Sequence, residues 1–250
     1  MPILTLRDGD ARQGSLVCVH PITGNAEVYA GLAHALAWPG PVLGFTAPEE
    51  AGYTLAELAR RYRDELDLAA PQRLLGWALG GVVAAELARA IVEAGGSVRF
   101  LGLLDSRAPQ PEMRRRPMER EAFAKAFIHN AAMTREKTPP ALAGTDAAHL
   151  AAALRELGDD ASDAQAERRF SIFMALGRAF YQHEQQPVSV PVHLFEAIDA
   201  HPSHPKPPTL GWEPLAPEVV HHPIAGTHFT LLAPAHVPAL AQAIDRALGG

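Results

Sequence analysis

The sequence predicts an α/β fold in which a mostly parallel sheet is flanked by helices, as one domain over residues 1–250. Short apolar runs alternate with longer amphipathic segments, which is the pattern of the βα units that build parallel sheets. The run Val98–Leu104 is almost entirely hydrophobic, as expected for a strand buried on both faces. Between residues 110 and 187 this alternation stops and segments of helical composition follow one another, so we expect a helical lid inserted within the domain.

In the first half of the chain, the pattern of apolar and polar residues predicts alternating strands and helices. Thr54 is a plausible N-cap for the second helix. The third helix, Leu79–Val92, is rich in alanine and carries almost no charge until Glu86, which is typical of a helix packed centrally on the sheet. The predicted strands are Ser15–Val19, Pro41–Phe45, Arg73–Trp77 and Val98–Leu104, and the predicted helices begin near Asn25, Thr54 and Leu79.

The second half begins with the helical insertion and then returns to the sheet. In the insertion's last helix, four large apolar residues recur at helical spacing, and a core role is favoured for them over the lining of a cavity. These residues are Phe170, Phe173, Leu176 and Phe180. The predicted helices are Pro117–Met133, Asp146–Leu157 and Asp163–Glu184, followed by strands Val190–Glu196 and Val219–Pro223 and a last helix, His236–Leu248.

Composition narrows the class of protein. The formal net charge is −6 and no dominant Lys/Arg block occurs, which argues against nucleic acid or a membrane surface as the main partner. The single cysteine, Cys18, lies inside a predicted strand and is expected to be a small buried hydrophobe. No signal peptide or spanning apolar run is visible, so a cytoplasmic location is expected. The 12 histidines are scattered without an HExxH or Cys/His cluster, so no metal is expected.

The segment Gly76-Trp77-Ala78-Leu79-Gly80 lies between an apolar strand and an apolar helix, the context that a G-x-S-x-G nucleophile elbow requires. Glycines flank such an elbow because larger side chains would strike the neighbouring strand and helix. Position 78 projects at a helix N-terminus, where developing negative charge is favoured. The alternative is an ordinary βα turn with glycines for tight packing.

Two further residues complete a triad in the order nucleophile, acid, base that α/β-hydrolases use. Asp105 ends a buried strand, which places its carboxylate at the carboxyl edge of the sheet. His228 follows a strand in Gly226-Thr227-His228 and can reach the same edge from a loop. A turn or capping role for the Asp, and a structural role for the His, are the alternatives.

Such a histidine would take a proton from the nucleophile while the aspartate fixes its tautomer. The oxyanion of the tetrahedral intermediate needs backbone N–H donors. The residue after the nucleophile, Leu79, is one predicted donor. Ile22, in the loop after the first predicted strand, is the candidate for the second.

Together, Val19-His20-Pro21-Ile22-Thr23-Gly24, the elbow, Leu103-Leu104-Asp105-Ser106 and Gly226-Thr227-His228 resemble the chain-releasing (type I) thioesterase domains of nonribosomal peptide synthetases. The resemblance spans nearly the whole chain. It implies an α/β-hydrolase fold with a helical lid over residues 110–187 and no bound cofactor. It also implies a peptidyl thioester substrate, presented on the phosphopantetheine arm of an upstream peptidyl carrier domain. Position 78 would be acylated, and hydrolysis or cyclisation to a lactone or lactam would release the peptide.

The position of the acid bears on the subtype. Stand-alone editing thioesterases resemble this fold but usually carry the Asp after the following strand, where this chain has Asp199. Asp105 lies in a matching Leu-Leu-Asp context, so the releasing subtype is preferred. Arg107 and the cluster Arg114-Arg115-Arg116 are candidates for contacts with the carrier domain, its phosphate or an acidic group of the peptide, although a solvated face is favoured for the triple arginine.

The chain departs from the family pattern at Ala78, which has no nucleophile, so covalent turnover is expected to be absent. A Ser→Ala or Cys→Ala knock-out is favoured over a natural pseudoenzyme, because the Asp/His pair and the glycines are retained. Two other functions stay open: a binding module that holds carrier-bound acyl chains without reacting, and a free-standing esterase of small substrates.

Overall fold

A computed structural model of the chain describes residues 3–111, 119–199 and 207–249. Seven strands in these ranges form one sheet in the order β1-β3-β2-β4-β5-β6-β7. Neighbouring strands are parallel except for the pair β1 and β3, so the mostly parallel sheet is confirmed. The strands are β1 (Ile3–Arg7), β2 (Leu16–Val19), β3 (Val42–Phe45), β4 (Gln72–Trp77), β5 (Val98–Leu104), β6 (Val192–Ala197) and β7 (Val219–Ile224).

Strand β1 is an element that the sequence analysis did not predict. It lies at one edge of the sheet and pairs only with β3. Of its five residues only Leu6 is buried, so the segment shows neither a continuous apolar run nor a full alternation. An edge strand of this kind carries too weak a hydrophobic pattern for recognition from sequence.

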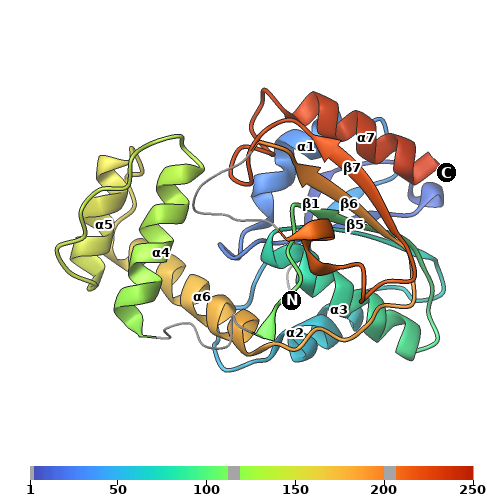
Figure 1. Cartoon of the computed structure of the whole chain (residues 1–250), viewed down its shortest axis with the longest axis horizontal. Helices are drawn as coiled ribbons and strands as arrows, with labels where there is room; N and C mark the ends of the chain where they lie inside the picture. The colour runs from blue at the N-terminus through green and yellow to red at the C-terminus, as the bar shows by residue number, and fades with distance from the viewer. Residues whose placement is uncertain (1–2, 112–118, 200–206, 250) are drawn as a thin grey trace.

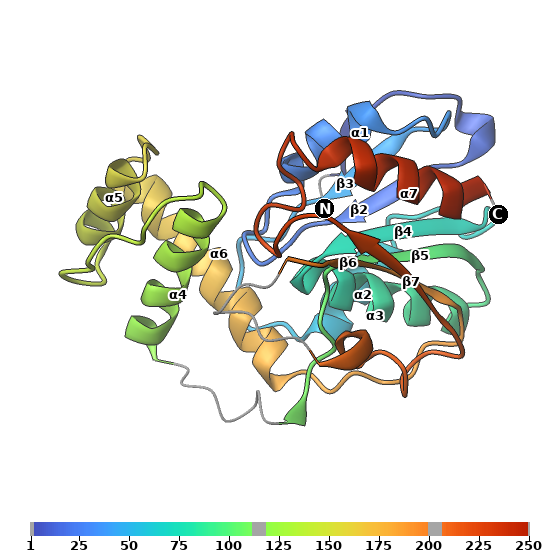
Figure 2. The same cartoon turned by 45° about the horizontal axis from the view of Figure 1, so that its top comes forward.

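Helices cover both faces of the sheet (Figures 1 and 2). α2 and α3 pack together on one face, and α1 and α7 pack together on the other. Because the central strands contribute side chains to both layers, two apolar cores form. The predicted helix after Asn25 begins as a 3-10 turn (Ala26–Tyr29) before α1. These four helices are α1 (Ala30–Ala35), α2 (Leu55–Arg63), α3 (Leu79–Glu93) and α7 (Val237–Gly249).

α3 has the central position that its composition predicts. Twelve of its residues are buried, and it contacts α2 and strands β2, β4 and β5. α2 begins at the predicted cap: the Thr54 hydroxyl accepts from the Glu57 N–H, and the Glu57 carboxylate accepts from the Thr54 N–H in return.

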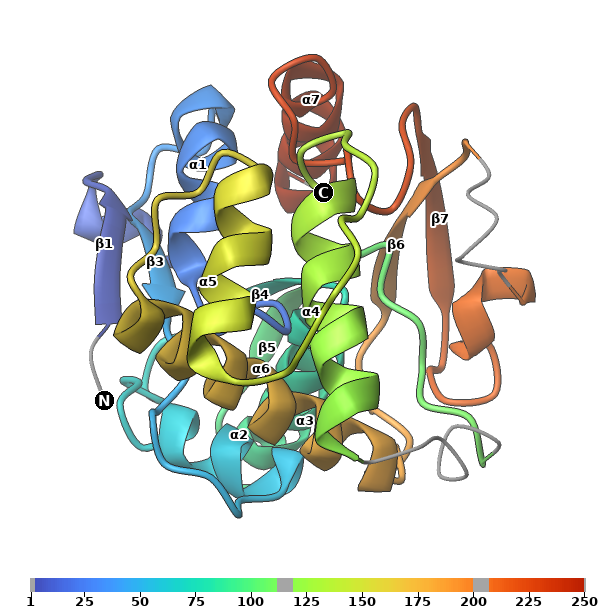
Figure 3. The ribbon, with the colours of Figure 1, turned by 90° about the vertical axis from the view of Figure 1, so that its left-hand side faces the viewer.

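Among the described residues between β5 and β6, three α-helices follow one another: α4 (Arg120–Met133), α5 (Ala147–Glu156) and α6 (Asp163–Gln182). Figure 3 shows them in front of the sheet when the molecule is viewed from their side. They share an apolar cluster of their own, to which Phe170 and Phe173 contribute. Leu176 belongs to the core of the sheet instead, and Phe180 packs against that core. The predicted core role of this apolar row is therefore confirmed.

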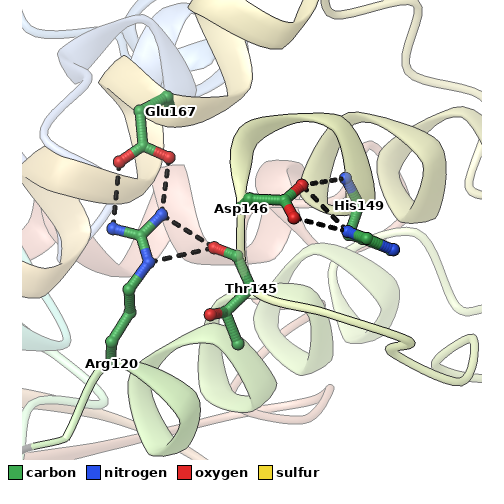
Figure 4. A network of polar contacts seen from close by, with 5 residues as sticks. All are labelled: Arg120, Thr145, Asp146, His149 and Glu167. Atoms are coloured by element: carbon green, nitrogen blue, oxygen red, sulfur yellow. Dashed lines mark hydrogen bonds and ion pairs between the residues drawn. The ribbon is translucent and has the colours of Figure 1, made fainter.

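A polar network at one end of these helices holds them together (Figure 4). The Arg120 guanidinium forms two hydrogen bonds with the Glu167 carboxylate on α6, at 3.0 and 2.6 Å, and donates to the Thr145 carbonyl at 3.0 and 2.7 Å. It also lies 4.7 Å from the centre of the Phe170 ring. Asp146 caps α5 and bonds the His149 ring at 2.8 Å. One arginine of α4 thus links α6 and the residue that precedes the N-cap of α5.

Candidate active site

The turn from β4 to α3 has the geometry of a sharp elbow. Ala78, which precedes the first residue of α3, has φ 54° and ψ −121°. Residues other than glycine rarely adopt this conformation. A Cβ on Gly76 would lie 2.2 Å from the backbone of Gly80, and a Cβ on Gly80 would lie 2.4 Å from the Val19 carbonyl oxygen. Both positions therefore require glycine, for the steric reason that the sequence pattern indicates.

Asp105 and His228, predicted from segments 123 residues apart, are in direct contact. The Asp105 Oδ2 atom lies 2.8 Å from His228 Nδ1, and both side chains are buried. The other carboxylate oxygen, Oδ1, accepts a hydrogen bond of 3.0 Å from the Ala197 N–H at the end of β6. A carboxylate at Nδ1 places a proton on that nitrogen, which makes Nε2 the proton acceptor of the neutral ring.

The elbow adjoins this pair. Trp77, immediately before Ala78, donates its indole N–H to the His228 carbonyl at 3.1 Å, and the two ring centres are 5.8 Å apart. On the other side, the Ala78 N–H donates to the Leu104 carbonyl at 3.0 Å, just before Asp105. The structure therefore brings positions 78, 105 and 228 together beyond the carboxyl ends of β4, β5 and β7, at the edge where α/β sheets place their ligand sites.

Asp199, the alternative acid, is placed elsewhere. Its Oδ2 atom accepts a hydrogen bond of 2.8 Å from the Gly226 N–H, and its own N–H donates to the Gly226 carbonyl. Asp199 is exposed, whereas Asp105 is only 2% exposed. Its side chain thus braces the loop that leads to His228, and Asp105 is the carboxylate that contacts the imidazole.

The two predicted oxyanion donors lie on segments that meet. Leu79 is the first residue of α3, so its N–H has no intrahelical acceptor. Gly80 packs against the backbone of Val19 and His20, which brings the loop containing Ile22 to the start of this helix. Beneath the loop, the buried His20 ring contacts the Pro21 carbonyl at 2.8 Å through Nδ1 and the Tyr62 hydroxyl at 2.7 Å through Nε2. Burial lowers the pKa of His20 to about 4, so this ring is neutral at pH 7.

The three inserted helices contact both loops of this site. The half-buried Ile22 packs against their apolar cluster, and a Cβ on Gly24 would lie 2.5 Å from Cγ2 of Ile172 on α6. On the other side, the His129 ring of α4 meets Phe229 edge-on at 5.9 Å, and Phe229 lies against His228 at 5.1 Å. The helices therefore lie over both the loop that contains Ile22 and the loop that contains His228 and Phe229, the histidine loop.

A cavity of about 420 Å³ adjoins this contact, between α4 and the loop before α5. His129 lines it and also touches Phe229, so the cavity borders the histidine loop. Its wall is mainly apolar, with Lys125 and His129 as the polar groups. The other lining residues are Ala126, Ile128, Pro139, Pro140 and Leu142.

Two buried hydroxyls support the elbow, and the sequence analysis missed both roles. The Tyr29 hydroxyl accepts from the Trp77 N–H and donates to the Val19 carbonyl, each at 2.7 Å. The Ser106 hydroxyl donates to the Ala78 carbonyl at 2.5 Å. Tyr29 appears in sequence only as an apolar helix position. Ser106 does stand beside the predicted acid, which is the one local signal that could have found it.

The structure also bears on Cys18, on metal-binding groups, on membrane-spanning helices and on the arginine cluster. Cys18 is buried in β2 as predicted, and burial raises the pKa of its thiol. Within residues 3–111, 119–199 and 207–249, no group of three or more His, Cys, Asp or Glu side chains could hold a metal ion. The helices in those same ranges include none that is long and apolar enough to span a membrane. Arg114, Arg115 and Arg116 lie outside the described residues.

Comparison with known families decides the assignment. The profile of the Thioesterase domain family matches residues 15–248. The chain belongs to the thioesterase domain family. Vanchrobactin synthetase VabF of Vibrio anguillarum is 27% identical over 98% of the thioesterase chain, and enterobactin synthase component F of Escherichia coli is 32% identical over 44% of it. The matches span 8% and 9% of those relatives, so the chain corresponds to a small part of each.

Solved structures agree with this assignment. The NocB thioesterase domain, in covalent complex with a fluorophosphonate nocardicin G analogue, is 27% identical with a TM-score of 0.71, and the match covers 100% of both chains. A four-domain nonribosomal peptide synthetase, holo-AB3403, has a TM-score of 0.87 and 25% identity over 98% of this chain and 20% of its own. The expected α/β-hydrolase fold is thereby confirmed, and the thioesterase is of the type found in nonribosomal peptide synthetases.

Proposed function

We propose that this thioesterase domain transfers acyl chains through a triad formed by position 78, His228 and Asp105, with position 78 as the site of the nucleophile. The observation that carries the proposal is the buried 2.8 Å contact between His228 Nδ1 and Asp105 Oδ2, located behind a strained elbow. A carboxylate that fixes the proton on Nδ1 leaves Nε2 as the base for a hydroxyl or thiol at position 78.

With serine or cysteine at 78, the steps follow from these positions. His228 Nε2 takes the proton of the nucleophile, which attacks the thioester carbonyl and forms a tetrahedral oxyanion. The N–H groups of Leu79 and Ile22 stabilise that oxyanion. The imidazolium then protonates the leaving thiolate, and the acyl chain remains on residue 78. Water, or a hydroxyl or amine of the bound acyl chain, then attacks the carbonyl of the acyl-enzyme. Residue 78 leaves, and the product is an acid, a lactone or a lactam, respectively.

The substrate that we propose is a peptidyl thioester on the phosphopantetheine arm of an upstream carrier domain. This proposal is supported by the similarity of the chain to nonribosomal peptide synthetases. The similar region makes up only a small share of each of those synthetases. The contact of Asp105, rather than Asp199, with the imidazole favours the releasing subtype over a stand-alone editing thioesterase. No cofactor takes part in this mechanism.

We propose residues 110–187 as the lid. Its helices lie against the loops of Ile22 and His228, and the cavity bordered by His129 offers an apolar wall for the acyl chain. A closed apolar enclosure that excludes water favours cyclisation, whereas an open one admits water and favours hydrolysis.

A second function has one specific observation in its favour. Ala78 offers no atom that can be acylated, so the chain as written can bind a thioester without consuming it. We propose this binding role for the Ala78 form, and acyl transfer for a form with serine or cysteine at that position.

The decisive experiment restores the nucleophile. Ala78→Ser and Ala78→Cys are treated with a fluorophosphonate probe and with a peptidyl thioester of N-acetylcysteamine, and adducts and products are followed by mass spectrometry. Acyl transfer predicts labelling at residue 78 and turnover of the thioester, both lost when His228→Ala is added. A lack of both labelling and turnover in the two variants would refute the enzymatic proposal and leave the binding role.

A further inference from the structure

The peptide unit between residues 78 and 79 is held by a side chain that the triad does not include. Ser106, which is 0% exposed, donates its hydroxyl proton to the Ala78 carbonyl oxygen. The hydroxyl lies against the first turn of α3, since a Cβ on Gly81 would be 2.3 Å from Ser106 Oγ. The same carbonyl also accepts from the Gly81 N–H at 3.2 Å. Both of its lone pairs are therefore used.

That peptide unit also carries the N–H of Leu79. A trans peptide is planar, and its C=O and N–H bonds point in opposite directions. Fixing the carbonyl of residue 78 therefore fixes the direction of the Leu79 N–H. A hydrogen bond to the carbonyl also polarises the unit and makes the N–H a stronger donor.

We infer that Ser106 is a positioning residue for the oxyanion hole, which it serves by aiming and strengthening the Leu79 N–H. This inference rests on the proposed acyl transfer, in which Leu79 supplies an oxyanion donor. The adjacent residues Asp105 and Ser106 then have parallel roles. Asp105 orients the base, His228, and Ser106 orients the oxyanion donor, the Leu79 N–H.

The need for such a support comes from the backbone itself. Ala78 has φ 54°, and Asp105, the residue before Ser106, has φ 41°, so the backbone has a positive φ at one partner of the hydrogen bond and next to the other. A strained turn reaches a lower energy by rotating the peptide unit unless contacts hold it. Ser106 is itself anchored, because its carbonyl accepts a 2.7 Å hydrogen bond from the indole N–H of the buried Trp212. The bond thus connects the elbow to the buried core around Trp212.

The first test needs no activity. In the chain as written, the carbonyl ¹³C of Ala78 and the amide ¹⁵N of Leu79 are measured by NMR in Ser106→Ala, Ser106→Cys and Ser106→Thr. Loss of the hydroxyl should shift both resonances upfield in the Ala variant. The shift should be smaller in the Cys variant, because a thiol donates weakly, and smallest in the Thr variant, which keeps a hydroxyl. Unchanged resonances in a folded Ala or Cys variant would overturn the inference.

The second test adds Ala78→Ser. Because removal of an oxyanion donor costs about 10²–10³ in kcat, misaiming one should lower kcat by about 10–100-fold in Ser106→Ala, with KM within a few-fold and recovery in Ser106→Thr. Binding of a trifluoromethyl ketone analogue should weaken by the same factor as kcat.

Tyr29→Phe is the matched control. It also removes a buried hydroxyl from the elbow, but at the peptide N–H of Trp77 rather than at the 78–79 unit. It should leave the Leu79 ¹⁵N shift near its starting value. Equal effects of the Tyr29 and Ser106 variants on that shift would mean a general loosening of the elbow and would refute a specific role. If Ala78→Ser alone has no activity, the proposed function fails, while the NMR comparison still decides the role of Ser106.

Discussion

Replacing Ala78 with glycine should make this protein more stable, although glycine usually destabilises. Ala78 is held at φ 54° and ψ −121°, and strain of this kind costs about 2 kcal/mol. Glycine adopts this conformation without strain. Its greater conformational freedom in the unfolded chain lowers the free energy of unfolding by about 0.7 kcal/mol relative to alanine. Removing a partly buried methyl group costs a further ~0.4 kcal/mol. The net expectation is a gain of about 1 kcal/mol, which raises Tm by about 2–4 °C in a domain of this size.

Urea denaturation followed by circular dichroism measures this difference directly. Ala126→Gly serves as the control, because Ala126 is exposed within α4 and glycine there should cost about 1 kcal/mol through helix propensity. Each of the two substitutions removes one Cβ methyl group, and they should move the urea midpoint in opposite directions. A loss of stability in both would show that residue 78 is not strained and would remove the argument that the elbow is built for a projecting nucleophile.

Three further predictions concern the acid, one buried histidine and the inserted helices. In an Ala78→Ser background, Asp105→Asn should lower kcat by about 10⁴-fold, while Asp199→Asn should retain activity within a few-fold; the reverse ranking of thioester turnover rates would reassign the acid. His20 is neutral in the fold, with a pKa of about 4 against an ordinary 6.5, so the unfolded chain binds a proton first as pH falls. His20 alone should therefore remove about 3 kcal/mol of stability between pH 6.5 and pH 4, and His20→Asn should remove that contribution from a urea-midpoint profile. Arg120→Ala should cost ~1 kcal/mol and speed proteolysis of the loop before α5, whereas Lys125→Ala, which breaks only an exposed pair, should change neither.

The sequence predicted most of the sheet and the main contact of the site, for physical reasons. Buried parallel strands are continuous apolar runs, and the elbow glycines are required by contacts under 3 Å with the backbone. Asp105 and His228 were predictable because each follows a strand of the same sheet, whose carboxyl ends meet at one edge. The catalytic use of these residues remains a prediction.

The elements that the sequence did not indicate depend on contacts between distant segments. β1 has a single buried side chain and owes its place to pairing with β3. The hydroxyls of Tyr29 and Ser106 reach the elbow across 48 and 28 residues, respectively. Hydrogen bonds of this range leave no periodic signal in the sequence, because the two partners are far apart along the chain. Only the three-dimensional arrangement shows that both hydroxyls act on the peptides around residue 78.

The state of residue 78 also bears on how this chain arose. A left-handed alanine and a buried Asp105–His228 pair each carry a cost, the first in strain and the second in desolvation. A chain that only binds acyl groups gains nothing from either, and mutation would relax both over time because glycine at 78 is a more stable choice and a buried ion pair adds little net stability. Since both costly features are intact, we infer that the nucleophile was replaced in a chain otherwise shaped for catalysis. A parent coding sequence with serine or cysteine at position 78 is the expected finding, and an alanine codon there would contradict it.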